Sequence, residues 1–193
     1  MKEILMVAGP NGAGKTTMVR ELLLQRSTLY DFLNADEIAV GLAPLHPESV
    51  SLAASKLMIN RLKELLNAHK SFAFETTAAG TNYVKHLKSA KDHRYIINVV
   101  FLWLASPLDA VKRVAQRVKQ GGHNIPEQVI VKRYSLGLKN LFNHYLALAD
   151  TILVLDNSSE EMEQRLIARK EPDSSLEIIN QTIWQKMKAV TLE

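Results

Sequence analysis

Residues 9–16 read Gly-Pro-Asn-Gly-Ala-Gly-Lys-Thr, and this stretch decides the fold of the 193-residue chain. It follows an apolar run at residues 4–8 that predicts a buried strand, and it precedes a stretch with helical character at residues 17–25. Glycines let the backbone turn until several N–H groups point at one anion. Lys15 adds a positive charge for the outer phosphates of a nucleotide, and the Thr16 hydroxyl can hold Mg²⁺. The order of strand, glycine loop and helix predicts a P-loop, whereas a plain glycine-rich turn would not explain the Lys-Thr pair at the helix start.

The composition is that of a globular protein. Hydrophobic residues make up 47% of the chain, and its length suggests one domain over residues 1–193, with room for a small lid. No apolar run reaches the roughly 18 residues that a membrane span needs, and the N-terminus leads directly into the first strand, so we expect neither a membrane segment nor a signal peptide. The absence of cysteine excludes disulfides, thiolate metal sites and cysteine nucleophiles, and it favours a cytoplasmic location.

The chain is mildly basic, with a net charge of +4. A basic balance can indicate nucleic acid binding, but no basic run with interleaved aromatic residues is present. A site for a phosphorylated ligand needs several cations of its own. We therefore expect a phosphorylated ligand as the partner, and not nucleic acid.

Strand-like and helix-like stretches alternate along the chain. Near-continuous apolar runs favour strands of a parallel sheet covered on both faces, and the strongest such run is residues 95–104. Residues 50–66 carry apolar side chains three and four positions apart, which favours a helix. The expected strands are residues 4–8, 32–34, 71–76, 95–104 and 151–155. Five strands alternating with helices predict an α/β fold, a three-layer sandwich in which helices cover both faces of a five-stranded parallel sheet.

The helices of the second half have recognisable ends. Ser106 can cap a helix in which Pro107 takes the first position, and Gly121-Gly122 ends it. We expect its buried stripe to consist of Leu108, Val111, Ala115 and Val118. The next helix is expected from residue 126 to about residue 148. After the last strand we expect two helical segments with a break around residues 172–175, the second covering about residues 176–190.

Two carboxylates follow predicted strands. Ligands of parallel sheets bind beyond the carboxyl ends of the strands, so these side chains are candidates for one pocket. Asp36 follows the second strand and can accept the proton of an attacking hydroxyl as a general base, but it can equally be a helix-capping or solvated aspartate, and Glu37 is easily mistaken for it. Glu75 ends the third strand, where it can hold Mg²⁺ through water or bind substrate hydroxyls; the alternative is a surface acid at a strand end.

The segment at about residues 113–133 has the layout of a mobile lid. Arg113 and Arg117 lie one helical turn apart, and Lys132-Arg133 lies on the next helix. Paired glycines between them can act as a hinge, so that the arginines close over a transferring phosphoryl group. The alternative is two solvated basic helix faces. We expect His123, between the two helices, to be a structural residue and not a catalyst.

Asp156-Asn157-Ser158 follows the last strand. In related sheets this loop lies near the adenine base, so Asn157 is a candidate for nucleotide binding. A plain cap between the strand and the next helix is the alternative.

Together these segments resemble the zeta toxin family of P-loop kinases, as a compact member. The matching pieces are the P-loop, Asn34-Ala35-Asp36-Glu37, Phe74-Glu75-Thr76-Thr77, the segment from Gly121 to Glu127 with Arg133-Tyr134 beyond it, and Asp156-Asn157-Ser158. The resemblance covers about residues 1–160 and implies a P-loop kinase-like fold. It implies transfer of the γ-phosphate of ATP or GTP, with Mg²⁺, to the 3′-hydroxyl of UDP-N-acetylglucosamine. Some members are neutralised by an antitoxin protein.

The resemblance also implies roles for single residues. Lys15 contacts phosphates, Thr16 binds Mg²⁺, Asp36 is the base, and Glu75, with Thr77, binds the acceptor. Arg117 and Arg133 are our choices for the lid arginines that stabilise the transferring group, although the arginine spacing across the lid differs from that of the longer toxins. The residues expected to bind the nucleotide are Gly9, Pro10, Asn11, Gly12, Ala13, Gly14, Lys15, Thr16, Thr17 and Asn157.

Two other functions stay open. One is a kinase of another acceptor, such as a sugar acid, an antibiotic or a polynucleotide 5′ end. The other is a P-loop ATPase or nucleotide-dependent switch that acts on a partner protein and uses Glu75 to hold metal and water. The switch predicts hydrolysis without an acceptor and little need for Asp36.

Overall fold

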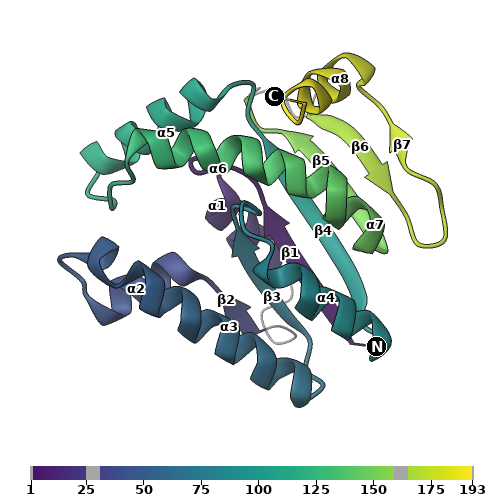
Figure 1. The fold of residues 1–193 in the computed structure, drawn as a ribbon, viewed down its shortest axis with the longest axis horizontal. Coiled ribbons are helices and arrows are strands. Elements are labelled where there is room, and N and C mark those ends of the chain that lie inside the picture. Colours follow the sequence, from purple (N-terminus) through teal and green to yellow (C-terminus); the bar gives the residue numbers. More distant parts are fainter. Residues whose placement is uncertain (1, 25–30, 159–164, 193) are drawn as a thin grey trace.

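A mixed sheet of seven strands forms the centre of the part that the structure describes, in the order β2-β3-β1-β4-β5-β6-β7 (Figure 1). This computed structural model describes residues 2–24, 31–158 and 165–192. Strands β1 to β5 pair in parallel, as expected, whereas β6 and β7 extend the sheet antiparallel, so the sheet is larger than the five predicted strands. The strands are β1 (Glu3–Ala8), β2 (Asp31–Leu33), β3 (Phe72–Thr76), β4 (Ile96–Trp103), β5 (Thr151–Asp156), β6 (Leu166–Lys170) and β7 (Glu177–Ile178).

Strand β1 lies in the middle of the parallel part and sets the position of the site. Its last residue, Ala8, pairs with Thr76 of β3 on one side and with Phe101 of β4 on the other. The apolar runs of β1, β3 and β4 are buried because helices cover both faces of these strands. The loops that follow the three strands therefore begin at the same edge of the sheet.

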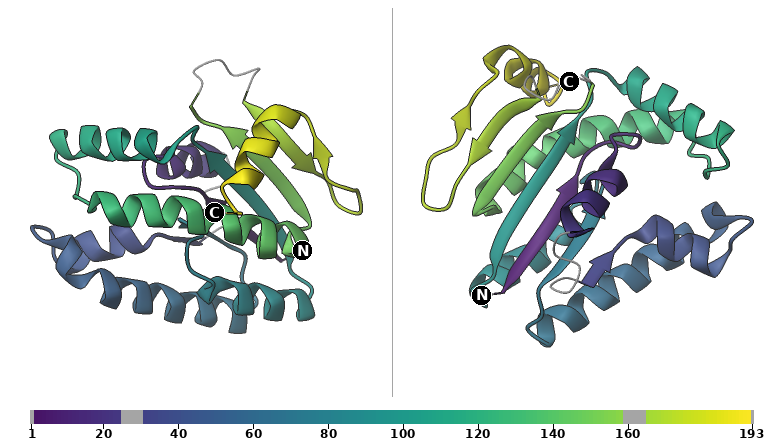
Figure 2. Two further views of the ribbon diagram at one scale, coloured as in Figure 1. Left: turned by 45° about the horizontal axis from the view of Figure 1, so that its top comes forward. Right: turned by 180° about the vertical axis from the view of Figure 1, so that it is seen from behind.

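Helices cover both faces of the sheet. Helix α1 lies against β1 and β3 on one face, and α3, α4 and α6 lie on the other (Figures 1 and 2). The helices are α1 (Lys15–Leu24), α2 (Ala35–Leu42), η1 (Pro47–Val50), α3 (Ser51–Asn67), α4 (Asn82–Asp92), α5 (Pro107–Lys119), α6 (Glu127–Asn140), η2 (Leu141–Tyr145), α7 (Leu146–Leu148) and α8 (Gln181–Ala189). Within the described ranges, each helix is too short or too polar to cross a lipid bilayer.

The start and end predicted for α5 are confirmed, but its buried stripe is wrong. Ser106 caps the helix by accepting a hydrogen bond from Asp109 N at 3.1 Å. Ala110 and Val114 form the buried face, with Val111 and Val118 half-buried, whereas Leu108 is 59% exposed and Ala115 is exposed. The reason is the close approach of α5 to the P-loop, where a Cβ on Gly12 would lie 3.1 Å from the Ala110 carbonyl oxygen.

The long helical stretch predicted after the glycine pair is confirmed. Helix α6 continues through the π-helical turn η2 into α7. The residues that face the core are Ile130, Tyr134, Leu138, Leu141 and Tyr145, as their spacing predicts. Together they attach this helix to the sheet beside the site.

The prediction for the C-terminal part is partly wrong. The first expected helical segment falls partly on residues 159–164, outside the described residues, and the part that follows is the strand β6. This strand buries Ile167 and Ala168 and pairs antiparallel with β5. The C-terminal helix is shorter than the predicted 176–190. Residues 177–178 form β7, and α8 begins only after its cap, Asn180. Trp184 of α8 packs edge-on against Phe142, with ring centroids 4.9 Å apart.

Candidate active site

The P-loop turns tightly between β1 and α1. Gly9 has a φ of +142°, and a Cβ there would lie 2.2 Å from the Leu102 carbonyl oxygen of β4. The loop is fastened from the other side by Asn157, whose Nδ2 donates to the Ala13 carbonyl oxygen at 2.7 Å. Both contacts hold the backbone of the loop against neighbouring strand ends. The loop is therefore shaped by the fold before any ligand binds.

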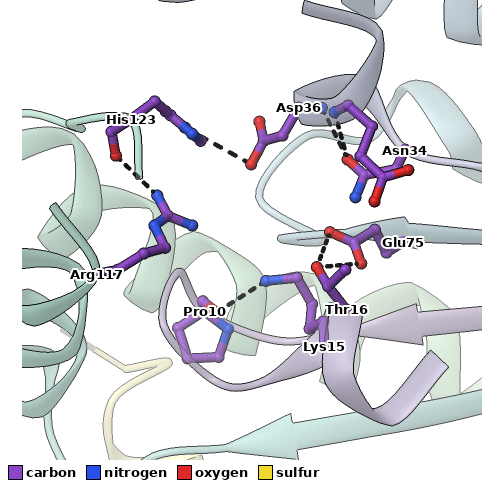
Figure 3. Close-up of polar contacts among 9 residues, drawn as sticks. Pro10, Lys15, Thr16, Asn34, Asp36, Glu75, Arg117 and His123 are labelled. Carbon is purple, nitrogen blue, oxygen red and sulfur yellow. Dashed lines mark hydrogen bonds and ion pairs between the residues drawn. The ribbon is translucent and has the colours of Figure 1, made fainter. Parts of the chain in front are cut away.

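The Lys15 ammonium lies inside this turn and donates to the Pro10 carbonyl oxygen at 2.9 Å (Figure 3). Burial lowers the pKa of Lys15, and the charges of Arg117 and Arg133 act in the same direction, while those of Glu75 and Asp36 oppose them. A buried cation of this kind gains most from a ligand that carries negative charge. The arrangement suits the outer phosphates of a nucleotide.

Thr16 and Glu75 lie side by side at the edge of the sheet. The Thr16 hydroxyl is 2.9 and 3.1 Å from the two carboxylate oxygens of Glu75, and its single proton is donated to this carboxylate. Burial raises the pKa of Glu75, while the charge of Lys15 and the Thr16 hydrogen bond act to lower it. Mg²⁺ prefers oxygen ligands, and in nucleotide sites one or two protein groups suffice because phosphates and water complete its coordination shell. The hydroxyl of Thr16 and the carboxylate of Glu75 fit that ion.

The start of α2 separates Asp36 from its neighbour Glu37. Asn34 caps the helix, because its Oδ1 accepts hydrogen bonds from Asp36 N at 2.8 Å and from Glu37 N at 3.3 Å. The capping role considered for Asp36 therefore belongs to Asn34. The Asp36 carboxylate lines the cavity, whereas Glu37 does not line it and pairs with Arg20 of α1 at 3.4 Å.

One cavity of about 670 Å³ joins these groups at the ends of the strands; we call it the strand-end cavity. It reaches from the P-loop to the groove between α3 and α4. Of the residues predicted from the sequence, those that line it are Asn11, Lys15, Asp36, Glu75, Thr77 and Arg133. The carboxylates of Asp36 and Glu75 and the ammonium group of Lys15 therefore line the same cavity.

The segment between α5 and α6 approaches the Asp36 side chain, which lines the cavity. His123 Nε2 lies 3.7 Å from Asp36 Oδ2, and Arg117 Nη2 donates to the His123 carbonyl oxygen at 3.2 Å (Figure 3). Arg117 Nε is buried and has no hydrogen-bond partner among the described residues. Arg113 is used differently from Arg117, since its Nη2 donates to the Asn157 carbonyl oxygen at 2.7 Å.

Sequence reasoning missed the residues that hold the loop after β3. Asn140 of α6 donates to the carbonyl oxygens of Ala78 and Ala79 at 2.7 and 3.1 Å. Gly137 lets α6 approach, because a Cβ there would lie 2.6 Å from the Thr77 carbonyl oxygen. Asn11, which we predict to bind the nucleotide, lines the cavity, and its buried Oδ1 has no partner among the described residues. The available signal for the loop after β3 was the pair Gly137 and Asn140, three residues apart inside a predicted helix.

Solved structures with the same architecture include toxin and kinase structures. A chain of the AvrRxo1-ORF1:AvrRxo1-ORF2 complex, crystallised with sulphate ions, superposes with a TM-score of 0.79 at 14% identity, and the match covers 100% of the present chain but 65% of that chain. A structure of the PezAT toxin–antitoxin system of Streptococcus pneumoniae gives 0.65 at 14% identity, covering 100% and 85%. Shikimate kinase from Bacteroides thetaiotaomicron gives 0.50 at 16% identity, covering 84% and 91%. At these identities the likeness establishes a P-loop kinase-like fold.

Sequence comparison agrees with the fold. An uncharacterised protein of Haemophilus influenzae is 25% identical over 130 residues, which cover 67% of the present chain and 91% of that protein. Residues 4–134 match the profile of a family described as an AAA domain, and this match spans more than half of the chain, from β1 to α6. The chain therefore belongs to this AAA domain family of P-loop proteins.

Proposed function

We propose that the protein is a kinase of the zeta toxin kind, which transfers the γ-phosphate of ATP or GTP to a hydroxyl group of a small molecule. UDP-N-acetylglucosamine, at its 3′-hydroxyl, or a related sugar is the proposed acceptor. The observation that carries the proposal is the shared cavity: Lys15 opens into the same space as Asp36 and Glu75. A hydrolase needs room for one water beside the γ-phosphate, whereas about 670 Å³ lies within the range of small-molecule sites, roughly 300–1,000 Å³.

Each polar group has a place in that reaction. The P-loop amides and Lys15 would hold the phosphates, and Thr16, with Glu75 beside it, would hold Mg²⁺, which supplies charge neutralisation when bound. Asp36 would take the proton of the acceptor hydroxyl as its oxygen forms a bond to the γ-phosphorus. The bond to the β–γ bridging oxygen breaks, and the nucleoside diphosphate leaves. Arg117 and Arg133 would stabilise the charge on the transferring group, with the α5–α6 segment acting as the lid.

The similar structures support the nucleotide and, more weakly, the partner. Another crystal of the AvrRxo1 complex contains ATP, and the shikimate kinase match supports a phosphotransferase. PezAT is a toxin–antitoxin system, which supports a protein partner of the antitoxin kind for the present chain. Because the chain spans 65% of the AvrRxo1 chain that it matches, the activity of that whole protein is not carried over.

The test is a transfer assay with ATP labelled in its γ-phosphate and Mg²⁺. Four parallel reactions contain UDP-N-acetylglucosamine, free N-acetylglucosamine, a 5′-hydroxyl oligonucleotide or no acceptor. We expect label in the sugar nucleotide, and none with Lys15→Ala. Label in the oligonucleotide would show that a polynucleotide, and not the sugar nucleotide, is the acceptor. Free phosphate without any labelled acceptor would contradict the kinase proposal and favour the hydrolytic switch that uses Glu75.

A further inference from the structure

The strand-end cavity has a second end that the transfer chemistry does not use. Its two carboxylates, Asp36 and Glu75, lie at the P-loop end. Away from the P-loop, the charged lining residues are Lys56 and Lys63 of α3 and Lys85 of α4. The lining thus changes from mixed charge at the P-loop to purely cationic between the two helices.

The lysines lie along a groove that leads away from the reacting atoms. Helices α3 and α4 contact each other and both start at the strand-end edge of the sheet (Figure 1). Lys56 and Lys63 are two helical turns apart on α3, which separates them by about 10 Å along the helix axis. Lys63 and His86 also line a second cavity of about 470 Å³ farther along the same helices. The space is long enough for an extended ligand.

These ammonium groups have no counter-ion within the described parts of the chain. None of the three makes a hydrogen bond or an ion pair there, although Arg61, on another side of α3, pairs with both Asp31 and Glu64. Their charge is felt locally: burial lowers the pKa of His86, and the charges of Lys85 and Lys63 lower it further. Like charges gathered in one groove repel one another, so the groove gains stability when an anion enters.

We propose that Lys56, Lys63 and Lys85 form an anion-binding site that holds the phosphate end of the acceptor. An ammonium group on a flexible stem suits phosphate as a point charge. The uncharged part that carries the reacting hydroxyl then lies toward Asp36, and the phosphate end lies between α3 and α4. The identity of the occupant as the acceptor rests on the proposed kinase function, whereas the existence of the anion site does not.

The test measures binding of UDP by calorimetry while the P-loop is saturated with Mg²⁺ and a non-hydrolysable ATP analogue. The variant carries Lys56→Gln, Lys63→Gln and Lys85→Gln together. Lys88→Gln is the matched control, because Lys88 lies one turn from Lys85 on α4 but lines neither cavity. We expect wild type and the control to bind UDP alike, the triple variant to bind at least tenfold more weakly, and uridine to bind no better to wild type than to the triple variant.

Two results would overturn the inference: no UDP binding by wild type under these conditions, or equal binding by the triple variant. The transfer assay separates this failure from failure of the kinase. If the protein only hydrolyses ATP but binds UDP through the three lysines, the kinase proposal is wrong and the anion site stands. Transfer to UDP-N-acetylglucosamine with an unchanged KM in the triple variant would keep the kinase and remove the anion site.

Discussion

The two walls of the strand-end cavity are built in different ways. On the P-loop side the backbone of the loop is held in place by its neighbours: Gly9 lies against the Leu102 carbonyl, and the Asn157 side chain holds the Ala13 carbonyl. On the α3–α4 side the wall consists of side chains, such as Lys56 and Lys85, which are exposed and make no hydrogen bonds to the other described residues.

The difference separates what the fold dictates from what can vary. The P-loop backbone cannot change its position without moving β1 or β4. The geometry of the P-loop side of the cavity is therefore dictated by the fold. Exposed side chains on a helix can be exchanged at little cost in stability. The acceptor end is therefore where members of one fold can differ in substrate.

The largest effect is expected from placing a side chain in the backbone wall. Gly9→Ala would put a Cβ 2.2 Å from the Leu102 carbonyl oxygen at a φ of +142°, and we expect a loss of about 3 kcal/mol or more in the free energy of unfolding. Urea unfolding measures this. Gly41→Ala in α2 is the control, since a Cβ there meets nothing within 4 Å, and it should change stability by less than about 1 kcal/mol. Equal stability of the two variants would show that the P-loop wall is not rigid.

An effect on rate and not on stability is expected at Arg117 of α5. If Arg117 stabilises the transferring group as proposed, Arg117→Ala should lower the transfer rate about 10²–10³-fold, while ATP affinity changes little. Steady-state kinetics and ATP titration separate these quantities. Lys119→Ala, at the exposed end of the same helix, should behave as wild type. A loss confined to ATP affinity would place Arg117 with the ground-state phosphates instead.

The smallest effect is expected away from both walls, at the start of β5. Burial acts to raise the pKa of Asp150, but hydrogen bonds from Lys91 and Ile97 N outweigh it and hold the pKa below its usual value. Its stabilising contribution is therefore present above about pH 4 and is lost as the pH falls through the lower, folded-state pKa. Asp150→Asn should cost about 1 kcal/mol at pH 7, with the difference shrinking toward pH 2. Urea unfolding at both pH values tests this, and a difference independent of pH would contradict it.

The same contrast explains how much of the molecule could be predicted. The P-loop and the strands around it follow from residues whose backbone roles are distinctive, such as the Lys15-Thr16 pair at a helix start. The face of α5 could not be predicted from apolar spacing, because the close approach of its backbone to Gly12 of the P-loop places Ala110 and Val114 on the buried side. The prediction of a helix at β6 is wrong, since a strand that completes a sheet edge depends on its distant partner β5.

The candidate site divides in the same way. The sequence places Asn34 and Asp36 together after the second strand. That Asn34 caps α2 while the Asp36 carboxylate stays free of this role could be seen only from the hydrogen bonds of the cap. The lysines of α3 and α4 could not be predicted as part of the site, because a polar helix position gives no sign of the cavity it faces. Only the packing of α3 on α4 gathers them.

The most direct test of the central claim compares Asp36→Asn with Glu37→Gln in transfer to UDP-N-acetylglucosamine. The two carboxylates are adjacent in sequence, yet Asp36 faces the cavity and Glu37 pairs with Arg20. If Asp36 is the base, Asp36→Asn should lower kcat by about 10²–10⁴-fold without weakening ATP binding, while Glu37→Gln keeps nearly wild-type activity. Substantial transfer by Asp36→Asn, or equal losses in both variants, would contradict the account.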